Sequence, residues 1–314
     1  MSVFDDFNKY VQLTATETVD QQVNLWNTAT RGALTLTSAN DNTGSFAEKS
    51  SYALMAGLYG NRDPSSTAAL SATSLNVLKS KAVKVGMGSL PMEYTGSEFD
   101  WTLRGPEEAG IAFGEQVGAA KFQYMLNTAL ASLVASVTTT GLTADNTAAK
   151  ASLSALNEAA RKFGDRSASL VAWVMDSGAM HDIYGNSLSN SNRLFTFENV
   201  QVMDDGFGRM LIMTDSPALV FDNSGTDNRY QLGLVPMAVS VEDNGDSRVY
   251  TETKTEYDNA RQLIKEESSF NIGIKGMTYA GGEMPDDADL ALAANWTQIA
   301  TSTKDTALVA SITL

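Results

Sequence analysis

The longest regular pattern of apolar and polar positions in the chain lies between residues 106 and 138. Pro106 suits the first position of a helix, and Glu107 and Glu108 favour the positive end of the helix dipole. Apolar residues then recur at helical spacing: Ile111, Val117, Met125, Leu126, Leu130, Leu133, Val134 and Val137. The pattern predicts one helix over about 106–138. At 1.5 Å per residue it is roughly 45–50 Å long, so we expect a rod that crosses the molecule.

Three glycines recur every four residues within this helix, at Gly110, Gly114 and Gly118. They place a strip without side chains along one helix face, where another backbone can approach closely. Unoccupied, the glycines only weaken the helix. We therefore predict a packing groove on the helix, and the charged Glu115 and Lys121 favour a groove in a water-exposed protein over a membrane dimerisation face.

A helix, a strand and a second helix are predicted between residues 147 and 185. Apolar residues from Ala149 to Phe163 keep helical spacing over about 147–163, and Gly164 follows as a C-cap. The run SLVAWVM is too short for a helix and indicates a buried strand. Asp176 is an expected N-cap of a short helix that reaches about Gly185.

Strand patterns dominate from about residue 195 onward. Short runs of alternating apolar and polar residues are separated by turn-forming residues. Asn244 and Gly245 lie between two such runs, which is typical of a β-hairpin turn. A last strand runs through Ile264 and Ile274, and a short apolar strand surrounds Leu308–Ile312. Helices and strands together predict an α+β fold.

Residues 76–104 are predicted to form a two-stranded ribbon. Val83 and Val85 flank Lys84 in the first strand, and Met92 and Tyr94 flank Glu93 in the second. Glycines and a proline between them indicate a reversal of the chain. A ribbon of two strands is marginally stable alone, so it must lie on another surface. We expect it to contact a neighbouring subunit and not to belong to its own subunit's core.

Residues 1–50 are rich in polar residues, and their large apolar residues are scattered. This composition predicts an extended arm whose apolar side chains need another surface to cover them. The covering surface is either a neighbouring subunit or the chain's own domain. Choosing the neighbour, we predict the following contacts between subunits: Phe4, Phe7, Trp26, Val83, Val85, Met92, Tyr94 and Trp101.

Composition narrows the possible functions. The chain has 314 residues, a formal net charge of −15, no cysteine and one histidine, His181. These counts exclude disulfides, thiolate metal sites, cysteine nucleophiles and sites that need two imidazoles. The negative charge makes tight, sequence-specific binding of nucleic acid unexpected. Asp5 and Asp6 stand where a secretory signal has basic residues, and no apolar run is long enough for a membrane span.

The search for catalytic chemistry predicts no catalytic, cofactor-binding or metal-binding residue. The sequence lacks a complete glycine-rich phosphate loop. A serine–histidine–acid triad would have to use His181, which is expected on a short helix beside Asp182. The carboxylate pairs are explained by helix ends, turns and strands. A small hydrolase that uses His181 or a carboxylate pair is retained as an alternative of a different class.

With these elements in order, the chain resembles the major capsid proteins of tailed bacteriophages, which have the Hong Kong 97-like fold. The shared phrases are VKVG before PMEYT, then SLVAWVMDSGAMHDIYG, GFGRMLIMTDSPAL, NIGIKGMTY and NWTQIATSTKDT. The resemblance implies these regions: an N-terminal arm at 1–50; a linker and extended β loop at 51–104; a peripheral domain with a long spine helix at 105–146 and 251–280; an axial α/β domain at 147–250; and a C-terminal segment at 281–314.

The resemblance also implies a function. Copies of the chain would form hexamers and pentamers that close into an icosahedral phage head around packaged double-stranded DNA. Implied partners are other copies, a portal and a decoration protein. The chain has no long helical segment before the predicted arm, which implies a separate scaffolding protein or none. The expected location is the virion, after assembly in the host cytoplasm. An encapsulin-like compartment or a phage tube subunit is the alternative among structural proteins.

Overall fold

The computed structural model describes residues 3–38, 44–52, 65–66, 77–95, 105–187, 194–197, 200–204, 208–255 and 260–314. Its main helices are α1 (Val3–Ala29), α3 (Pro106–Thr140), α4 (Leu153–Arg161), α5 (Ser177–Ser187) and α6 (Asp287–Ala291). Short 3₁₀ helices are η1 (Gly164–Ser169), η2 (Pro217–Leu219), η3 (Ala293–Asn295) and η4 (Thr303–Asp305).

The described strands form two large sheets and one small one. The first sheet has the order β1 (Leu34–Ser38), β12 (Val239–Asp243), β14 (Arg261–Ile274), β3 (Val77–Gly88) and β2 (Phe46–Tyr52), and β13 (Arg248–Lys254) and β4 (Met92–Thr95) also pair with β14. The second has the order β5 (Thr143–Asn146), β17 (Leu308–Thr313), β11 (Asp227–Leu234), β6 (Ala172–Met175), β9 (Met210–Met213), β8 (Val200–Asp204) and β7 (Leu194–Phe197), with β10 (Val220–Asp222) on β11. Strands β15 (Met277–Tyr279) and β16 (Trp296–Gln298) form the small sheet.

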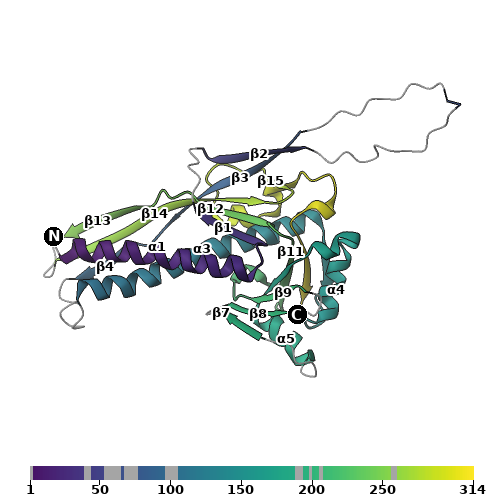
Figure 1. Cartoon of the computed structure of the whole chain (residues 1–314), viewed down its shortest axis with the longest axis horizontal. Helices are drawn as coiled ribbons and strands as arrows, with labels where there is room; N and C mark the ends of the chain where they lie inside the picture. The colour runs from purple at the N-terminus through teal and green to yellow at the C-terminus, as the bar shows by residue number, and fades with distance from the viewer. Residues whose placement is uncertain are drawn as a thin grey trace.

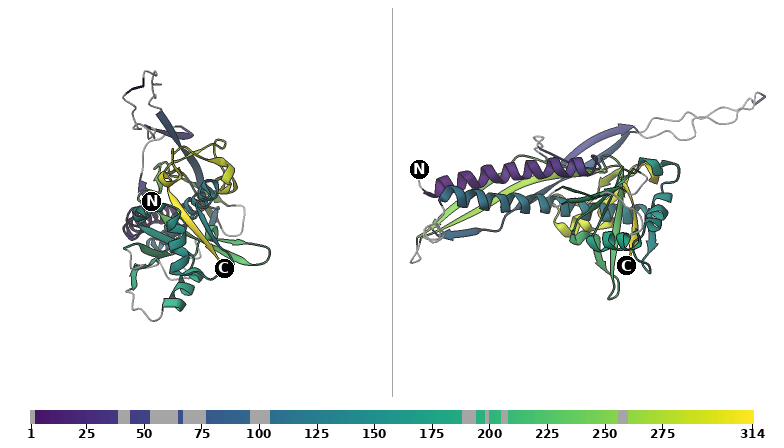
Figure 2. Two further views of the ribbon diagram at one scale, coloured as in Figure 1. Left: turned by 90° about the vertical axis from the view of Figure 1, so that its right-hand side faces the viewer. Right: turned by 60° about the horizontal axis from the view of Figure 1, so that its bottom comes forward.

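The molecule is elongated (Figure 1). Helices α1 and α3 and the strands β13, β14 and β4 form a long projection at one side of a body that contains β11, α4 and α5. We call this projection the arm from here on; it is not the extended N-terminal arm expected at residues 1–50. The pair β2–β3 lies above the body in the view of Figure 1, and the views in Figure 2 agree that it rises from one side of the molecule. Helix α3 runs from the arm into the body and contacts elements of both large sheets.

The predicted long helix is confirmed. Helix α3 begins at Pro106 with Glu107 and Glu108 in its first turn, and Gly141 ends it in the left-handed conformation with a φ of 67°. Its middle and last turns form the centre of the core, where Leu130, Leu133 and Val137 are fully buried. The predicted buried strand is β6, and the short helix that follows is α5. Helix α4 is shorter than the predicted 147–163.

The extended conformation predicted for residues 1–50 is wrong for α1, a helix of 27 residues. Its buried residues are spaced almost regularly by four: Phe7, Val11, Ala15 and Val19, with Trp26 two turns later. Four-residue spacing is one of the ridge directions on a helix surface. Threonines and asparagines surround this ridge, and some of them, such as Thr14 and Thr18, also pack against α3, so polar residues conceal the ridge in the sequence. The segment therefore looks irregular when only its composition is considered.

Both predicted hairpins are also wrong. Strands β3 and β4 do not pair with each other; both pair with β14, one after the other and in the same direction. In the same way, β12 and β13 follow each other along the opposite edge of β14, with Asn244 and Gly245 between them. The turn residues interrupt a strand without reversing it, because the 14-residue strand β14 is long enough to pair with two strands in a row on each edge.

Several strands join sheets that cross the region boundaries expected from the resemblance. Strand β12, predicted in the axial region 147–250, belongs to the sheet of the arm. Strands β3 and β4, predicted in an extended loop at 51–104, pair with β14 in that same sheet. Strand β17, predicted in a separate C-terminal segment, lies between β5 and β11 in the body. Among the described residues, no helix has the length and apolarity needed to cross a membrane.

Candidate assembly site

The glycine strip of α3 is occupied by α1. A Cβ atom built on Gly114 would lie 2.7 Å from the carbonyl oxygen of Val11 and 2.9 Å from Cβ of Thr14. The corresponding distance at Gly118 is 2.7 Å to the carbonyl oxygen of Ala15. Real Cβ atoms do not come this close to a backbone oxygen, so only glycine permits the contact. Because residue numbers increase together along the contact, the two helices run in the same direction.

Four predicted subunit contacts are already covered by their own chain. Phe7, Trp26, Val83 and Val85 are only 4%, 1%, 0% and 1% exposed. The ring of Phe7 packs against Tyr94 with a centroid distance of 4.6 Å, and Trp26 packs against Phe122 at 6.3 Å. The prediction that a neighbour covers these four side chains is therefore wrong. The side chain of Phe4 and all of Trp101 lie outside the described part of the structure.

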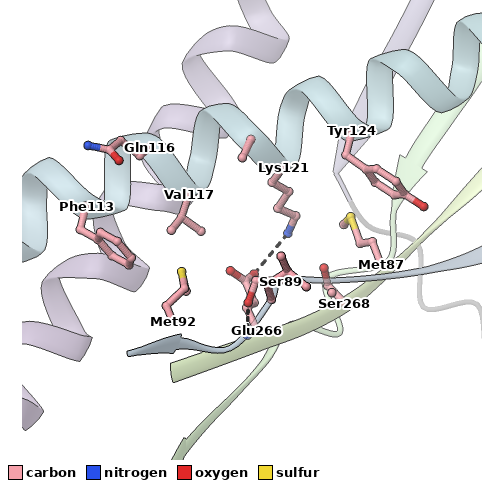
Figure 3. Close-up of a pocket in the computed structure, with 13 residues that line it drawn as sticks. Met87, Ser89, Met92, Phe113, Gln116, Val117, Lys121, Tyr124, Glu266 and Ser268 are labelled. Atoms are coloured by element: carbon pink, nitrogen blue, oxygen red, sulfur yellow. Dashed lines mark hydrogen bonds and ion pairs between the residues drawn. The ribbon is translucent and has the colours of Figure 1, made fainter. Parts of the chain in front are cut away.

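Met92 and Tyr94 are half-buried on β4 and stay predicted contacts. The hydroxyl of Tyr94 donates a hydrogen bond to Asn8 at 3.1 Å. Met92 lines an apolar cavity of about 390 Å³ between α3 and the strands β3, β4 and β14 (Figure 3). Phe113 and Val117 of α3 form the opposite wall, and Leu90 at its rim is 85% exposed. This end of the arm therefore presents apolar surface next to a hollow.

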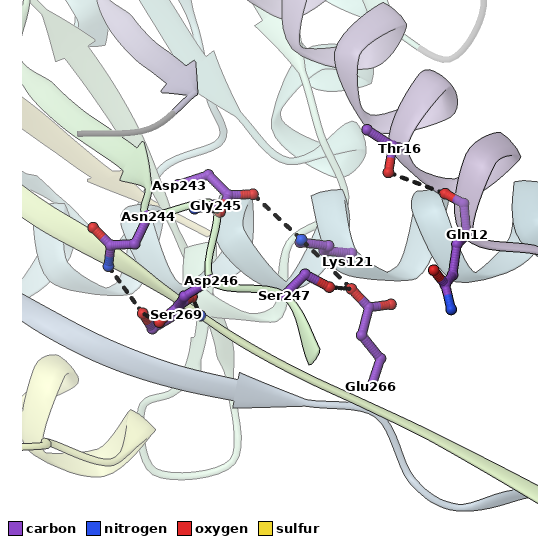
Figure 4. A network of polar contacts seen from close by, with 10 residues as sticks. All are labelled: Gln12, Thr16, Lys121, Asp243, Asn244, Gly245, Asp246, Ser247, Glu266 and Ser269. Carbon is purple, nitrogen blue, oxygen red and sulfur yellow. Dashed lines mark hydrogen bonds and ion pairs between the residues drawn. The ribbon is translucent and has the colours of Figure 1, made fainter. Parts of the chain in front are cut away.

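A cluster of polar and charged residues lies beside the middle of β14. Here β12 gives way to β13 on one edge of β14, and β3 gives way to β4 on the other. Nζ of Lys121, from α3, lies 3.3 Å from Oδ2 of Asp243 and 3.7 Å from Oε1 of Glu266. The hydroxyl of Ser247 donates a hydrogen bond to Glu266 at 2.8 Å. We call Lys121, Asp243, Ser247 and Glu266 the Lys121 cluster (Figure 4). Its side chains join α3 to the ends of β12 and β13 and to the middle of β14.

A second polar network adjoins the Lys121 cluster. Oδ1 of Asp246 accepts a hydrogen bond from the amide of Ser269 at 2.7 Å, and Oδ2 accepts one from the hydroxyl of Ser269 at 2.6 Å. Nζ of Lys84 lies 3.6 Å from Oδ2. Burial of Asp246 favours its neutral form, but the hydrogen bonds from Ser269 and the charge of Lys84 outweigh this, so its pKa is lowered. Neither this network nor the Lys121 cluster was predicted, because their members are distant in sequence.

The pKa of Asp246 gives a testable pH dependence. A carboxyl group whose pKa is lower in the folded state contributes stability above its unfolded pKa of about 4, and the contribution is lost as the pH falls through the folded value. Asp246→Asn is therefore expected to melt at a lower temperature than the wild type at pH 7, and the difference should shrink as the pH falls below about 4 toward the lowered folded pKa. Thermal unfolding of both proteins between pH 7 and pH 3 tests this. A difference that grows toward low pH would contradict the assigned role.

The structure places the candidate catalytic groups apart. His181 is exposed on α5, and the neighbouring Asp182 pairs with Lys150 at 3.0 Å. Glu266 faces Lys121, whereas Glu267 pairs with Lys265 at 2.6 Å. Asp286 caps α6 by accepting a hydrogen bond from the amide of Asp289 at 2.8 Å. Within the described residues, no group of three or more histidine or carboxylate side chains is arranged to hold a metal ion.

One further polar contact joins helix α3 to helix α6 in the C-terminal part of the chain. The hydroxyl of Tyr124, on α3, donates a hydrogen bond to Asp287 at 2.9 Å. Burial and the neighbouring carboxylate raise the pKa of Tyr124 to about 12. The phenol therefore stays protonated and acts as a fixed donor. Lys121 and Tyr124 are one helical turn apart, so the Lys121 cluster and this contact hold the same face of α3.

Comparison with solved structures places this architecture in a known class. A protein of Mycobacterium phage Cain superposes with a TM-score of 0.53 at 11% identity, covering 81% of this chain and 86% of that one. The capsid of Ralstonia phage GP4 gives 0.52 at 10% identity with coverages of 89% and 86%. Microbacterium phage Oxtober96 gives 0.51 at 12% identity with coverages of 91% and 90%. At these identities the likeness concerns the fold alone: it is the Hong Kong 97-like fold of phage capsid proteins.

The family follows from the sequence itself. The sequence model of the family described as "Major capsid protein 13-like" matches residues 3–310. The chain belongs to this family and is a structural subunit of a phage capsid. No curated protein matches the chain.

Proposed function

We propose that copies of this chain assemble into hexamers and pentamers that close into the icosahedral head of a tailed phage around double-stranded DNA. The observation that carries the proposal is the family match over residues 3–310, together with the fold. The capsid role itself is established by the family. The arrangement of the copies and the enclosed DNA are the proposed parts.

The elongated shape supports ring formation. The arm projects from one side of the body, and the β2–β3 pair rises separately above it (Figure 1). A subunit with different surfaces at its two ends forms head-to-tail contacts, and such contacts close into rings when the rotation between copies allows it. We propose the end of the arm with Met92 and Tyr94, and the adjoining cavity, as one contact surface.

The proposed domains follow the sheets. The peripheral domain consists of α1, α3 and the sheet that contains β14, and the axial domain consists of the sheet that contains β6 and β17 with α4 and α5. This keeps the two-domain division implied by the resemblance and moves its boundaries to the observed strands.

The negative net charge of the subunit suits a shell into which DNA is packed. With a net charge of −15, the subunit is expected to bind duplex DNA weakly at physiological salt, because phosphate contacts need clustered cations. Lys79 and Lys81 stand close together in the sequence, but in the structure they lie 3.9 and 3.7 Å from Glu48, which offsets part of their charge. We further propose a portal, a decoration protein and, for guided assembly, a separate scaffolding protein as partners, and assembly in the host cytoplasm.

Expression of the chain with and without its genomic neighbours tests the proposal. Size-exclusion chromatography followed by electron microscopy of the purified material should show rings, capsomers or closed shells. A monomer of 33.5 kDa under all conditions would contradict it. Open tubes would support a tube subunit instead of a head.

His181→Ala is expected to leave assembly and phage viability unchanged. The imidazole is exposed, and assembly needs no proton transfer. Electron microscopy of the particles and a plaque assay measure the two properties. Normal particles combined with a strong loss of plaques would indicate an enzymatic role for His181.

A further inference from the structure

Two exposed methionines have a backbone conformation that side chains disfavour. Among the described residues, four that are not glycine have a positive φ: Arg31 at 51°, Ser224 at 59°, Met237 at 56° and Met284 at 51°. Met237 and Met284 are also 66% and 63% exposed. Glycine or asparagine suits such a backbone better, and a polar residue suits such exposure better. Neither local structure nor the subunit core accounts for methionine at these positions.

The backbone around Met237 is held firmly. Met237 follows Pro236, and a proline followed by a residue with positive φ is the pattern of a tight turn that favours glycine. The amide of Met237 donates to the carbonyl of Gly32 at 2.8 Å. Nζ of Lys275 donates to the carbonyl of Pro236 at 3.2 Å. The strained conformation persists because its surroundings fix it, and the side chain is presented to solvent.

The surroundings of the two methionines have opposite charge. Lys275 lies beside the Met237 turn, because its Nζ donates to the carbonyl of Pro236. Arg31 precedes Gly32, which accepts the hydrogen bond from Met237, and its guanidinium donates to the carbonyl of Gly208. Met284 lies in an acidic segment between Glu283 and Asp286, and both of these residues are exposed. Leu292, shortly after this segment, is also 52% exposed. Each methionine is therefore an apolar projection with a charged border.

We propose that the Met237 surface of one subunit docks on the Met284 surface of a second copy. The occupant is another copy of this chain because the two surfaces are complementary in charge and both carry the adaptable thioether that is enriched at interfaces. The contact joins two different surfaces, so it is head-to-tail and can build a ring. The inference rests on the proposed function, since only a self-assembling subunit needs such a contact.

Substitution of asparagine separates the subunit from its contacts. Asparagine accepts a positive φ, so Met237→Asn and Met284→Asn should melt at the wild-type temperature or above it. Each variant should nevertheless raise the protein concentration needed for particle formation about tenfold or more. Ser224→Asn is the matched control. Ser224 is exposed and also has a positive φ, but its substitution removes no apolar side chain. It should leave assembly unchanged.

Charge reversal provides a second, independent test. Lys275→Glu and Glu283→Lys should each impair assembly, and the double variant should restore it because the pair is re-formed between copies. Light scattering and electron microscopy measure the outcome. Normal assembly of Met237→Asn, or a double variant no better than the single ones, overturns this contact while wild-type particles preserve the proposed function. If the wild type forms no particles, the proposed function itself fails.

Discussion

Gly114→Leu is expected to lower the free energy of unfolding of the subunit by about 3 kcal/mol. A Cβ at this position would meet the carbonyl oxygen of Val11 at 2.7 Å and Cβ of Thr14 at 2.9 Å. Neither atom is the flexible end of a side chain, so α1 must move as a whole or detach from α3. Thermal and denaturant unfolding measure the loss, which corresponds to a fall in melting temperature of roughly 5–10 °C.

Gly185→Leu is the matched control. Gly185 is also a helical glycine, on α5, but it is exposed and a Cβ there would meet nothing within 4 Å. Leucine is a better helix former than glycine, so this variant should be as stable as the wild type or slightly more stable. If both leucine variants unfold alike, or if Gly114→Leu is as stable as the wild type, the tight packing of α1 on α3 is contradicted.

The glycine strip shows how much of the site the sequence could reveal. Repetition every four residues indicated a groove at Gly110, Gly114 and Gly118, because a helix brings such positions onto one face. It could not indicate the occupant. The ridge of α1, Phe7, Val11 and Ala15, has the same spacing, and aligning the two repeats would have suggested the pair. Composition instead favoured an extended arm, since polar residues outnumber large apolar residues in the segment that forms α1.

Turn residues were less informative than helix periodicity, because they describe only the local chain and not the strand that the chain pairs with next. Asn244 and Gly245 favour a turn locally, and Gly245 does have a positive φ of 65°. Whether the chain then reverses depends on which strand it meets next. Here β14 extends beyond β12, so β13 continues along it. The Lys121 cluster forms at this junction from α3, β12 and β14, and no local pattern brings those three segments together.

Replacement of residues 80–95 by a short glycine and serine linker is expected to unfold the subunit. As a ribbon covered by a neighbour, this segment would be dispensable for folding of its own chain. The structure instead pairs Val83–Gly88 and Met92–Thr95 with β14 and buries Val83 and Val85 almost completely. Each buried valine contributes about 2 kcal/mol, and the total stability of a domain is only about 5–15 kcal/mol. Far-ultraviolet circular dichroism should show the loss of folded structure.

Two point variants on β3, one at a buried and one at an exposed position, test this last prediction with smaller changes. Val83→Ala removes part of a fully buried side chain and should cost about 2 kcal/mol of unfolding free energy. Lys79→Ser changes an exposed residue of the same strand whose ammonium lies 3.9 Å from Glu48, so it should change stability by less than about 0.5 kcal/mol. A linker variant that keeps the wild-type circular dichroism, with both point variants equally harmless, would return β3 and β4 to the role of a ribbon that acts between subunits. Loss of folded structure in the linker variant, with destabilisation by Val83→Ala but not by the lysine variant, would place these strands in the core that β14 organises.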